Sequence, residues 1–156
     1  MRKLLVPITI AALASAADAE TLHLVCLGAG SANRFSSTSI YGMISSGQSA
    51  WGQAMSERSV GFDDQVDVEV NEAGTSRIRL PRAMLPRLRG GKDGWFELND
   101  VKITDAAITG TAQVNVINSP KVRLDRMTGR VSISGKAGDY SGECRKFDPA
   151  AVERKF

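Results

Sequence analysis

The sequence predicts a single small all-β domain, an antiparallel meander of about eight strands that forms a small closed or partly open barrel. Apolar residues alternate with polar ones at a period of two through most of the chain, and clusters of Gly, Asn, Asp and Ser interrupt them at short intervals. Cysteines lie near both ends, at Cys26 and Cys144. A bond between them would suit a barrel, because the first and last strands become neighbours when a sheet closes. A β-sandwich is the alternative.

Residues 1–19 have the order of a cleavable secretory signal. Met1-Arg2-Lys3 precedes a mostly apolar stretch, and Ala17-Asp18-Ala19 provides the small residues of a cleavage site. The apolar stretch has about fourteen residues and contains Pro7, whereas a membrane-spanning helix needs about twenty. We expect cleavage after Ala19, a mature domain over 20–156 without a transmembrane segment, and a periplasmic or secreted location.

The charge balance excludes a strongly basic nucleic-acid-binding surface. The 156 residues carry 20 Lys and Arg against 17 Asp and Glu, a formal net charge of +3. Losing the signal removes two basic residues and one acid, so the mature domain is nearly neutral. We therefore expect no nucleic-acid partner.

The two cysteines are the only ones in the chain, and in an exported protein they predict a disulfide. The Cys26–Cys144 bond would close a loop of more than about a hundred residues, which on the chain-entropy model stabilises the fold by about 4–5 kcal/mol.

The first predicted strand covers residues 22–26, where Leu22, Leu24 and Cys26 alternate with His23 and Val25. Residues 28–50 are rich in Gly, Ser and Thr, which predicts a loop with a short strand. The stretch 51–60 fits either a strand or a short helix.

A hairpin follows over residues 66–80, with its turn at 71–75. If Val70 pairs with Ser76, the register sets Glu69 opposite Arg77, Asp67 opposite Arg79, Val68 opposite Ile78 and Val66 opposite Leu80. Each of the last four pairs is complementary, so charge and hydrophobicity favour this register.

The remaining segments alternate in the same way. Residues 81–94 contain two prolines and three glycines and predict a long loop or a turn of helix. A hairpin over 96–103 and 108–116 has a phase slip that predicts a bulge at Asn99-Asp100. Gly110 and Ala112 on its inner face suggest a tight bend or a bulky neighbour, Trp95 or Trp51. Three further strands are expected around 122–124, 131–133 and 140–144.

Four segments together resemble a family of small exported bacterial proteins of uncharacterised function. They are Ser59–Val66, Arg89–Phe96, Asp125–Gly129 and Ser134–Cys144. The resemblance covers nearly all of the mature chain. It implies an architecture with a cysteine in the first strand, an Asp-Arg-x-Thr-Gly turn and a Gly-x-Cys ending, and it implies no activity or site.

Two glycine motifs fail as nucleotide-binding loops. Residues 25–33 imitate a dinucleotide fingerprint, but Asn33 replaces the third glycine and neither a helix nor a parallel unit follows. We interpret this segment as a flexible loop. Residues 129–137 have five residues between glycines where a phosphate loop has four, and Ala137 follows the lysine, so they predict a strand and turn.

The candidate chemical groups are few. His23 is the single histidine and is expected on the outer face of the first strand, and no Gly-x-Ser-x-Gly turn is present. An acidic cluster could in principle bind calcium through oxygen ligands, but the predicted hairpin already uses two of its members. This cluster comprises Asp63, Asp64, Asp67, Glu69 and Glu72. We expect no metal site, no cofactor and no enzymatic activity.

The most distinctive cluster is basic. Six cations, with no acid between Gly74 and Lys92, occupy Arg77, Arg79, Arg82, Arg87, Arg89 and Lys92. The hairpin uses the first two, which leaves Arg82, Arg87, Arg89 and Lys92 as candidate contacts for an anionic partner such as a lipid headgroup or polysaccharide of the cell envelope. Alternatively, the loop is solvated, and its apolar residues Met84, Leu85 and Leu88 cover one end of the core.

The sequence therefore predicts an exported, non-enzymatic binding or structural module whose partner is not identified. Envelope association through the basic loop 77–92 and an enzyme of unrecognised type are the alternatives.

Overall fold

The computed structural model describes residues 21–43, 47, 49–86, 93–148 and 151, so the predicted signal at 1–19 lies outside the described residues. Within them, the chain forms eight antiparallel strands and one short 3-10 turn, η1, with no α-helix. These elements are β1 (Leu22–Met43), β2 (Ser49–Val70), β3 (Ser76–Arg79), η1 (Arg82–Met84), β4 (Trp95–Ile103), β5 (Ala107–Ala112), β6 (Lys121–Asp125), β7 (Arg130–Gly135) and β8 (Gly138–Lys146).

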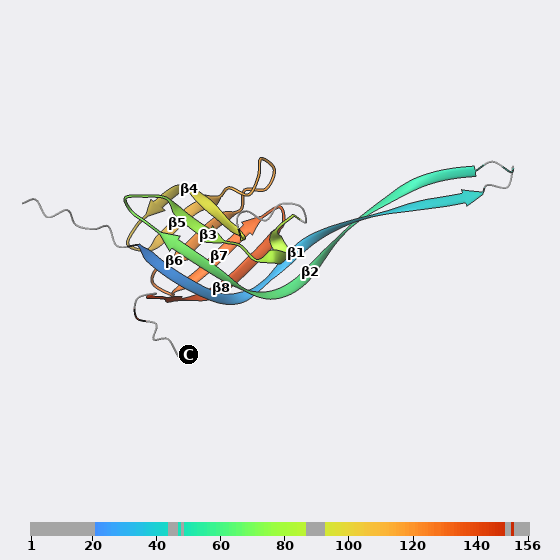
Figure 1. Ribbon diagram of the computed structural model, residues 1–156. Coiled ribbons are helices and arrows are strands. Elements are labelled where there is room, and N and C mark those ends of the chain that lie inside the picture. The colour runs from blue at the N-terminus through green and yellow to red at the C-terminus, as the bar shows by residue number, and fades with distance from the viewer. Residues whose placement is uncertain (1–20, 44–46, 48, 87–92, 149–150, 152–156) are drawn as a thin grey trace, which may run out of the picture.

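The strands follow one another around a single ring in sequence order, and β1 pairs with both β2 and β8 (Figure 1). The predicted all-β meander of about eight strands is confirmed, and the closed ring agrees with the barrel rather than with the sandwich. Cys26 lies opposite Cys144 in the β1–β8 register, and the two form a disulfide. The first and last strands are therefore neighbours, as predicted.

Side chains from every strand fill the interior of the ring. In β2, Val66, Val68 and Val70 are buried and alternate with more exposed residues, as a strand with one face on a core requires. Ile78, Ile133 and the other inward residues join them in one hydrophobic cluster. Met84 and Leu85 belong to the same cluster, so η1 closes one end of it.

Two local predictions are confirmed. In the β2–β3 hairpin, Asp67 pairs with Arg79, Val68 with Ile78 and Glu69 with Arg77. In the β4–β5 hairpin, the register shifts between Asn99 and Lys102, and Asp100 has φ 53°. Asp100 therefore has a left-handed backbone conformation, which is consistent with a bulge at the predicted position.

The prediction for residues 28–50 was wrong. Its described part belongs to two long strands, because β1 continues to Met43 and β2 begins at Ser49, in unbroken register from Leu22↔Val70 to Met43↔Ser49. Of the two options for 51–60, the strand is correct. The composition misleads because backbone hydrogen bonds form the ladder whatever the side chains are.

Glycines in β1 allow it to approach β8 closely. A Cβ on Gly28 would lie 2.1 Å from the Ser141 carbonyl oxygen, and one on its partner Gly142 would lie 2.8 Å from the Leu27 carbonyl oxygen. Residues 25–33, interpreted above as a flexible loop, are therefore strand at a close strand contact, which we call the β1–β8 seam.

Two predictions for the β4–β5 hairpin also need correction. The return strand ends at Ala112 rather than at residue 116, and Val116 is 97% exposed. Asn115 forms a turn there, with its side chain accepting hydrogen bonds from the backbone N–H groups of Ile117 and Asn118. The three atoms nearest to a Cβ on Gly110 would belong to Asn99, Val101 and Leu98 of β4, rather than to Trp95 or Trp51.

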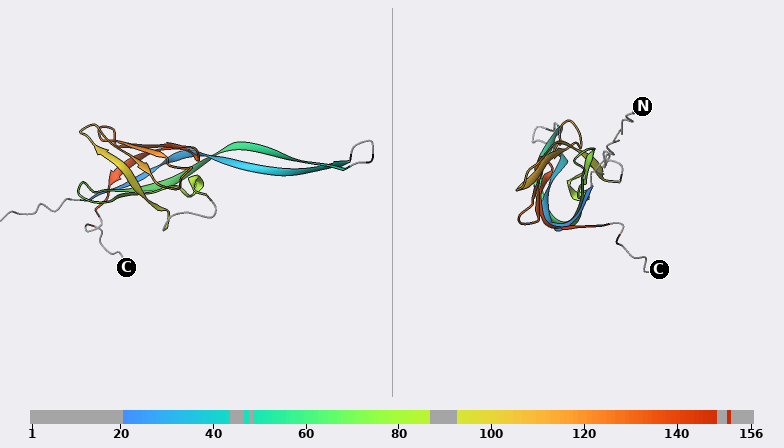
Figure 2. Two further views of the ribbon diagram at one scale, coloured as in Figure 1. Left: turned by 90° about the horizontal axis from the view of Figure 1, so that it is seen from above. Right: turned by 90° about the vertical axis from the view of Figure 1, so that its left-hand side faces the viewer.

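The outer halves of β1 and β2 leave the barrel together as a long twisted two-stranded ribbon (Figures 1 and 2). The last β1–β8 pair is Ala32↔Gly138, and the last β2–β3 pair is Asp67↔Arg79. We call Asn33–Met43 together with Ser49–Ser59 the arm. Asn33 still hydrogen-bonds to the carbonyl oxygens of Lys136 and Ala137 in the β7–β8 turn, and beyond it the arm residues pair only with one another in the described register.

We predict that Gly28→Ala destabilises the fold by roughly 1–3 kcal/mol, because the new methyl group must displace the β8 backbone. Urea unfolding of the purified protein measures the change. Gly52→Ala is the matched control, because a Cβ there has no atom within 4 Å, and its effect should stay within about 0.5 kcal/mol. Equal stabilities of the two variants would contradict the close contact.

We also predict that Cys26→Ser together with Cys144→Ser lowers the free energy of unfolding by about 4–5 kcal/mol on the chain-entropy model, because the bond joins residues 118 apart. Denaturant unfolding of the oxidised protein and of the double variant tests this. A loss below about 1 kcal/mol would show that the other strand contacts hold the ring closed without the bond.

Candidate functional site

The predicted basic loop is only partly within the described residues. Arg82 is exposed, and its backbone N–H donates to Asp64 Oδ2 at 3.3 Å, whereas Arg87, Arg89 and Lys92 lie outside the described residues. Met84 and Leu85 are 2% and 7% exposed. These two apolar residues therefore cover the core, as in the structural alternative, and offer no apolar contact to a partner.

Arg77 and Arg79 are held by the hairpin, as predicted. Arg77 donates to both carboxylate oxygens of Glu69, through Nη2 to Oε1 at 3.0 Å and through Nε to Oε2. This hydrogen bonding raises the pKa of the Arg77 guanidinium. Arg79 donates to Asp67 at 3.1 Å, and the Arg77 guanidinium lies 4.7 Å from the centre of the Trp95 ring. These pairs stabilise the outer face of the barrel and leave neither carboxylate unpartnered.

A groove of about 920 Å³ lies alongside β1, β2 and β8. His23 lies on it, with Nδ1 at 3.6 Å from Glu69 Oε1, beside Val25, Leu27 and Phe147. None of its lining residues is Ser, Thr or Cys. The groove therefore contains a candidate acid–base group, His23, but no side-chain hydroxyl or thiol that could act as a nucleophile.

Among the described residues, no group of three or more His, Cys, Asp or Glu is arranged to hold a metal ion. Of the acidic cluster proposed from the sequence, Asp67 and Glu69 bind arginines, while Asp64 accepts hydrogen bonds from the backbone N–H groups of Gln65 and Arg82.

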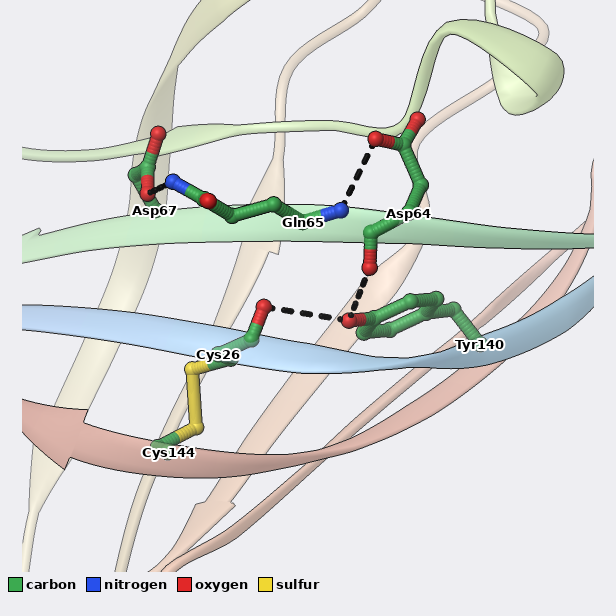
Figure 3. The surroundings of a disulfide bond; sticks show 6 residues. All are labelled: Cys26, Asp64, Gln65, Asp67, Tyr140 and Cys144. Carbon is green, nitrogen blue, oxygen red and sulfur yellow. Dashed lines mark hydrogen bonds between the residues drawn. A yellow bond between two sulfur atoms is a disulfide. The ribbon is translucent and has the colours of Figure 1, made fainter.

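Tyr140 is the most deeply buried titratable side chain near the disulfide (Figure 3). It is 2% exposed, and its hydroxyl lies 2.9 Å from the Asp64 carbonyl oxygen and 3.2 Å from that of Cys26. Burial raises the pKa of Tyr140 to about 12, and the Asp64 and Asp67 carboxylates add to the shift. The hydroxyl thus joins β8 to β1 and β2 inside the barrel, where it has a structural role.

The arm has two unlike faces. On one face, the cross-strand pair Tyr41↔Trp51 lies near the tip, with Met43 beyond it and Phe35 and Met55 toward the barrel. These five side chains are 73–83% exposed. The other face carries mostly small residues and includes Thr38 opposite Ala54 and Ile40 opposite Gly52. Monomeric soluble proteins rarely expose a contiguous apolar surface of this kind.

The outer part of the arm also has no charged residue. From Phe35 to Ser56 the chain contains no Asp, Glu, Lys or Arg, and the interval is bounded by Arg34 and Glu57. Exposed strand edges in water are usually protected by charged side chains, because an unpaired edge can bind another strand. Both edges of the arm lack this protection over that interval.

Comparison with known proteins identifies no relative. No protein-family model matches the chain, and no curated protein or solved structure is similar to it. Membership of a family of small exported bacterial proteins therefore stays a prediction, and the site must be argued from its own geometry.

Within the described residues, no helix has the length and apolar character needed to cross a bilayer. The disulfide is typical of proteins outside the reducing cytoplasm.

Sequence reasoning missed the arm, because residues 28–50 were interpreted as mostly loop. The signal that could have revealed it is the absence of charge between Arg34 and Glu57, combined with large apolar residues on both sides of the glycine at position 47. A solvated loop of this length would be expected to carry charged residues.

We predict that alkaline pH destabilises the protein through Tyr140. The folded-state pKa of about 12 exceeds the ordinary value of 10.0, so between these values the unfolded chain loses the phenol proton first and stability falls as pH rises. Urea unfolding at several pH values should show a loss of up to about 1.4 kcal/mol per pH unit in that window. Tyr140→Phe should remove this slope relative to wild type, and an unchanged slope would contradict the assignment.

Proposed function

We propose that this protein is an exported, non-enzymatic interaction module of the cell envelope, and that the arm is its binding surface. The observation that carries the proposal is the exposed group of Phe35, Tyr41, Met43, Trp51 and Met55 on a ribbon that projects beyond the barrel. Aromatic and methionine side chains are enriched in interfaces, and a folded protein rarely exposes so many of them together.

Stability gives a second reason to expect a partner. A two-stranded ribbon in water is at best marginally stable without a third strand or a packed face. Beyond Asn33, the described arm residues pair only across the ribbon, and the five large apolar side chains on one face are 73–83% exposed. Binding would cover the apolar face and lower the free energy of the ordered arm.

Export is supported by the signal-like residues 1–19 and by the disulfide. The barrel then serves as a compact support, because its interior is filled by a hydrophobic cluster that includes Tyr140. The other proposal from the sequence, envelope association through the basic loop, gains nothing from Met84 and Leu85, which are buried, while Leu88 lies outside the described residues.

The test removes the arm and keeps the barrel. Replacing residues 36–56 with Asn-Gly leaves the pair Phe35↔Glu57 next to a two-residue hairpin turn. We expect the shortened protein to fold with the thermal stability of wild type and to appear in the soluble extracytoplasmic fraction, whereas wild type is retained with the envelope. Equal retention of the two folded proteins would contradict the proposal.

A further inference from the structure

We propose that the arm inserts into the hydrocarbon layer of a phospholipid bilayer with anionic headgroups. This inference rests on the proposed function, because it names the partner of the same surface.

The length of the charge-free part matches a bilayer. On β1, Phe35–Met43 is a continuous exposed strand, paired in register with the β2 residues down to Ser49. About nine residues at about 3.3 Å each extend roughly 30 Å, close to the thickness of the hydrocarbon core. The first charged residues, Arg34, Glu57 and Arg58, lie together where this section meets the barrel.

The absence of charge distinguishes a bilayer from water. A strand in water tolerates Lys or Glu on its solvent face and uses them to protect its edges, whereas a charged side chain in the hydrocarbon layer is costly. Between Phe35 and Ser56 both faces and both edges of the arm are free of charge. Ser36 and Ser56 also hydrogen-bond to each other across the ribbon at 2.6 Å, which satisfies polar groups internally.

Aromatic side chains lie at both ends of this section. Tyr41 and Trp51 face each other near the tip, and Phe35 lies at the barrel end. Tyr and Trp prefer the boundary between hydrocarbon and headgroups. Trp51 and Tyr41 are 81% and 73% exposed, so they are free to contact lipid.

An arginine pair supplies the charge complementarity. Arg34 and Arg58 are directly opposite each other in the register and share one face, while Glu57 is on the other face. Like charges facing each other across a ribbon are destabilising in water. The net negative headgroups of an anionic bilayer, at the end of the charge-free section, would neutralise both guanidinium groups.

The open edges require that inserted arms associate. A ribbon in hydrocarbon cannot leave its outer backbone N–H and C=O groups unpaired. Arms from several copies must therefore pair edge to edge within the bilayer.

The experiment uses the mature chain and vesicles of phosphatidylcholine mixed with phosphatidylglycerol. Insertion should shift the emission of Trp51 to shorter wavelength, and lipids brominated in mid-chain should quench it. The Trp51→Phe variant keeps an aromatic ring at position 51, and its fluorescence gives the contribution of Trp95 to the emission. Vesicle sedimentation then compares binding of Tyr41→Ser/Trp51→Ser, which we expect to be roughly 100-fold weaker than wild type.

Ile117→Ser/Met127→Ser is the matched control, because it removes two apolar side chains that are 71% and 82% exposed on the barrel, and it should bind vesicles as wild type does. Arg34→Gln/Arg58→Gln should weaken binding to anionic vesicles roughly 10-fold and leave binding to pure phosphatidylcholine unchanged.

Three results would overturn the inference: no binding of wild type to vesicles, binding without quenching by mid-chain bromine, or association of arms in solution that vesicles do not reverse. If the purified protein does not bind vesicles but loss of the arm still releases it from the envelope in cells, the partner is an envelope component other than the phospholipid bilayer. The proposed function would then stand and the bilayer inference would fail.

Discussion

The close approach of β1 to β8 is the constraint on which the rest of the structure depends. It closes the ring, and three kinds of interaction maintain it: the backbone ladder, the Cys26–Cys144 bond and the Tyr140 hydroxyl beside two carbonyl oxygens. Glycine at positions 28 and 142 is required because a Cβ at either would collide with backbone. Without this contact β1 would be an edge strand, and the core would lose one wall.

The same strands that close the ring also form the candidate site. β8 stops pairing with β1 at Ala32, and β3 stops pairing with β2 at Asp67, yet β1 and β2 continue together to Met43 and Ser49. An inward side chain in the barrel part of these strands must pack in the core. A side chain in the arm has no core to pack against, which explains why Trp51 is exposed while Val66 is buried.

The sequence predicted the parts of the fold where side chains alternate clearly. Asp67, Glu69, Arg77 and Arg79 determined the β2–β3 register through charge, and the two cysteines indicated the closing strands. The prediction for residues 28–50 was wrong, because the sequence alone does not distinguish a glycine that permits close strand contact from a glycine that permits a turn. The arm was missed for a related reason: its large apolar side chains are separated by small residues rather than by charged ones, so the missing charges and the large apolar residues around position 47 are the features that distinguish it.

The continuity of β1 and β2 has a mechanical consequence. No loop separates the arm from the barrel, since β1 and β2 stay paired without a break on both sides of Ala32. A force applied to the arm is transmitted along β1 and β2 into the ring. On β1 this force reaches Cys26, where the disulfide to Cys144 transmits it to β8. A force applied to β1 of the arm therefore meets a covalent crosslink inside the ring.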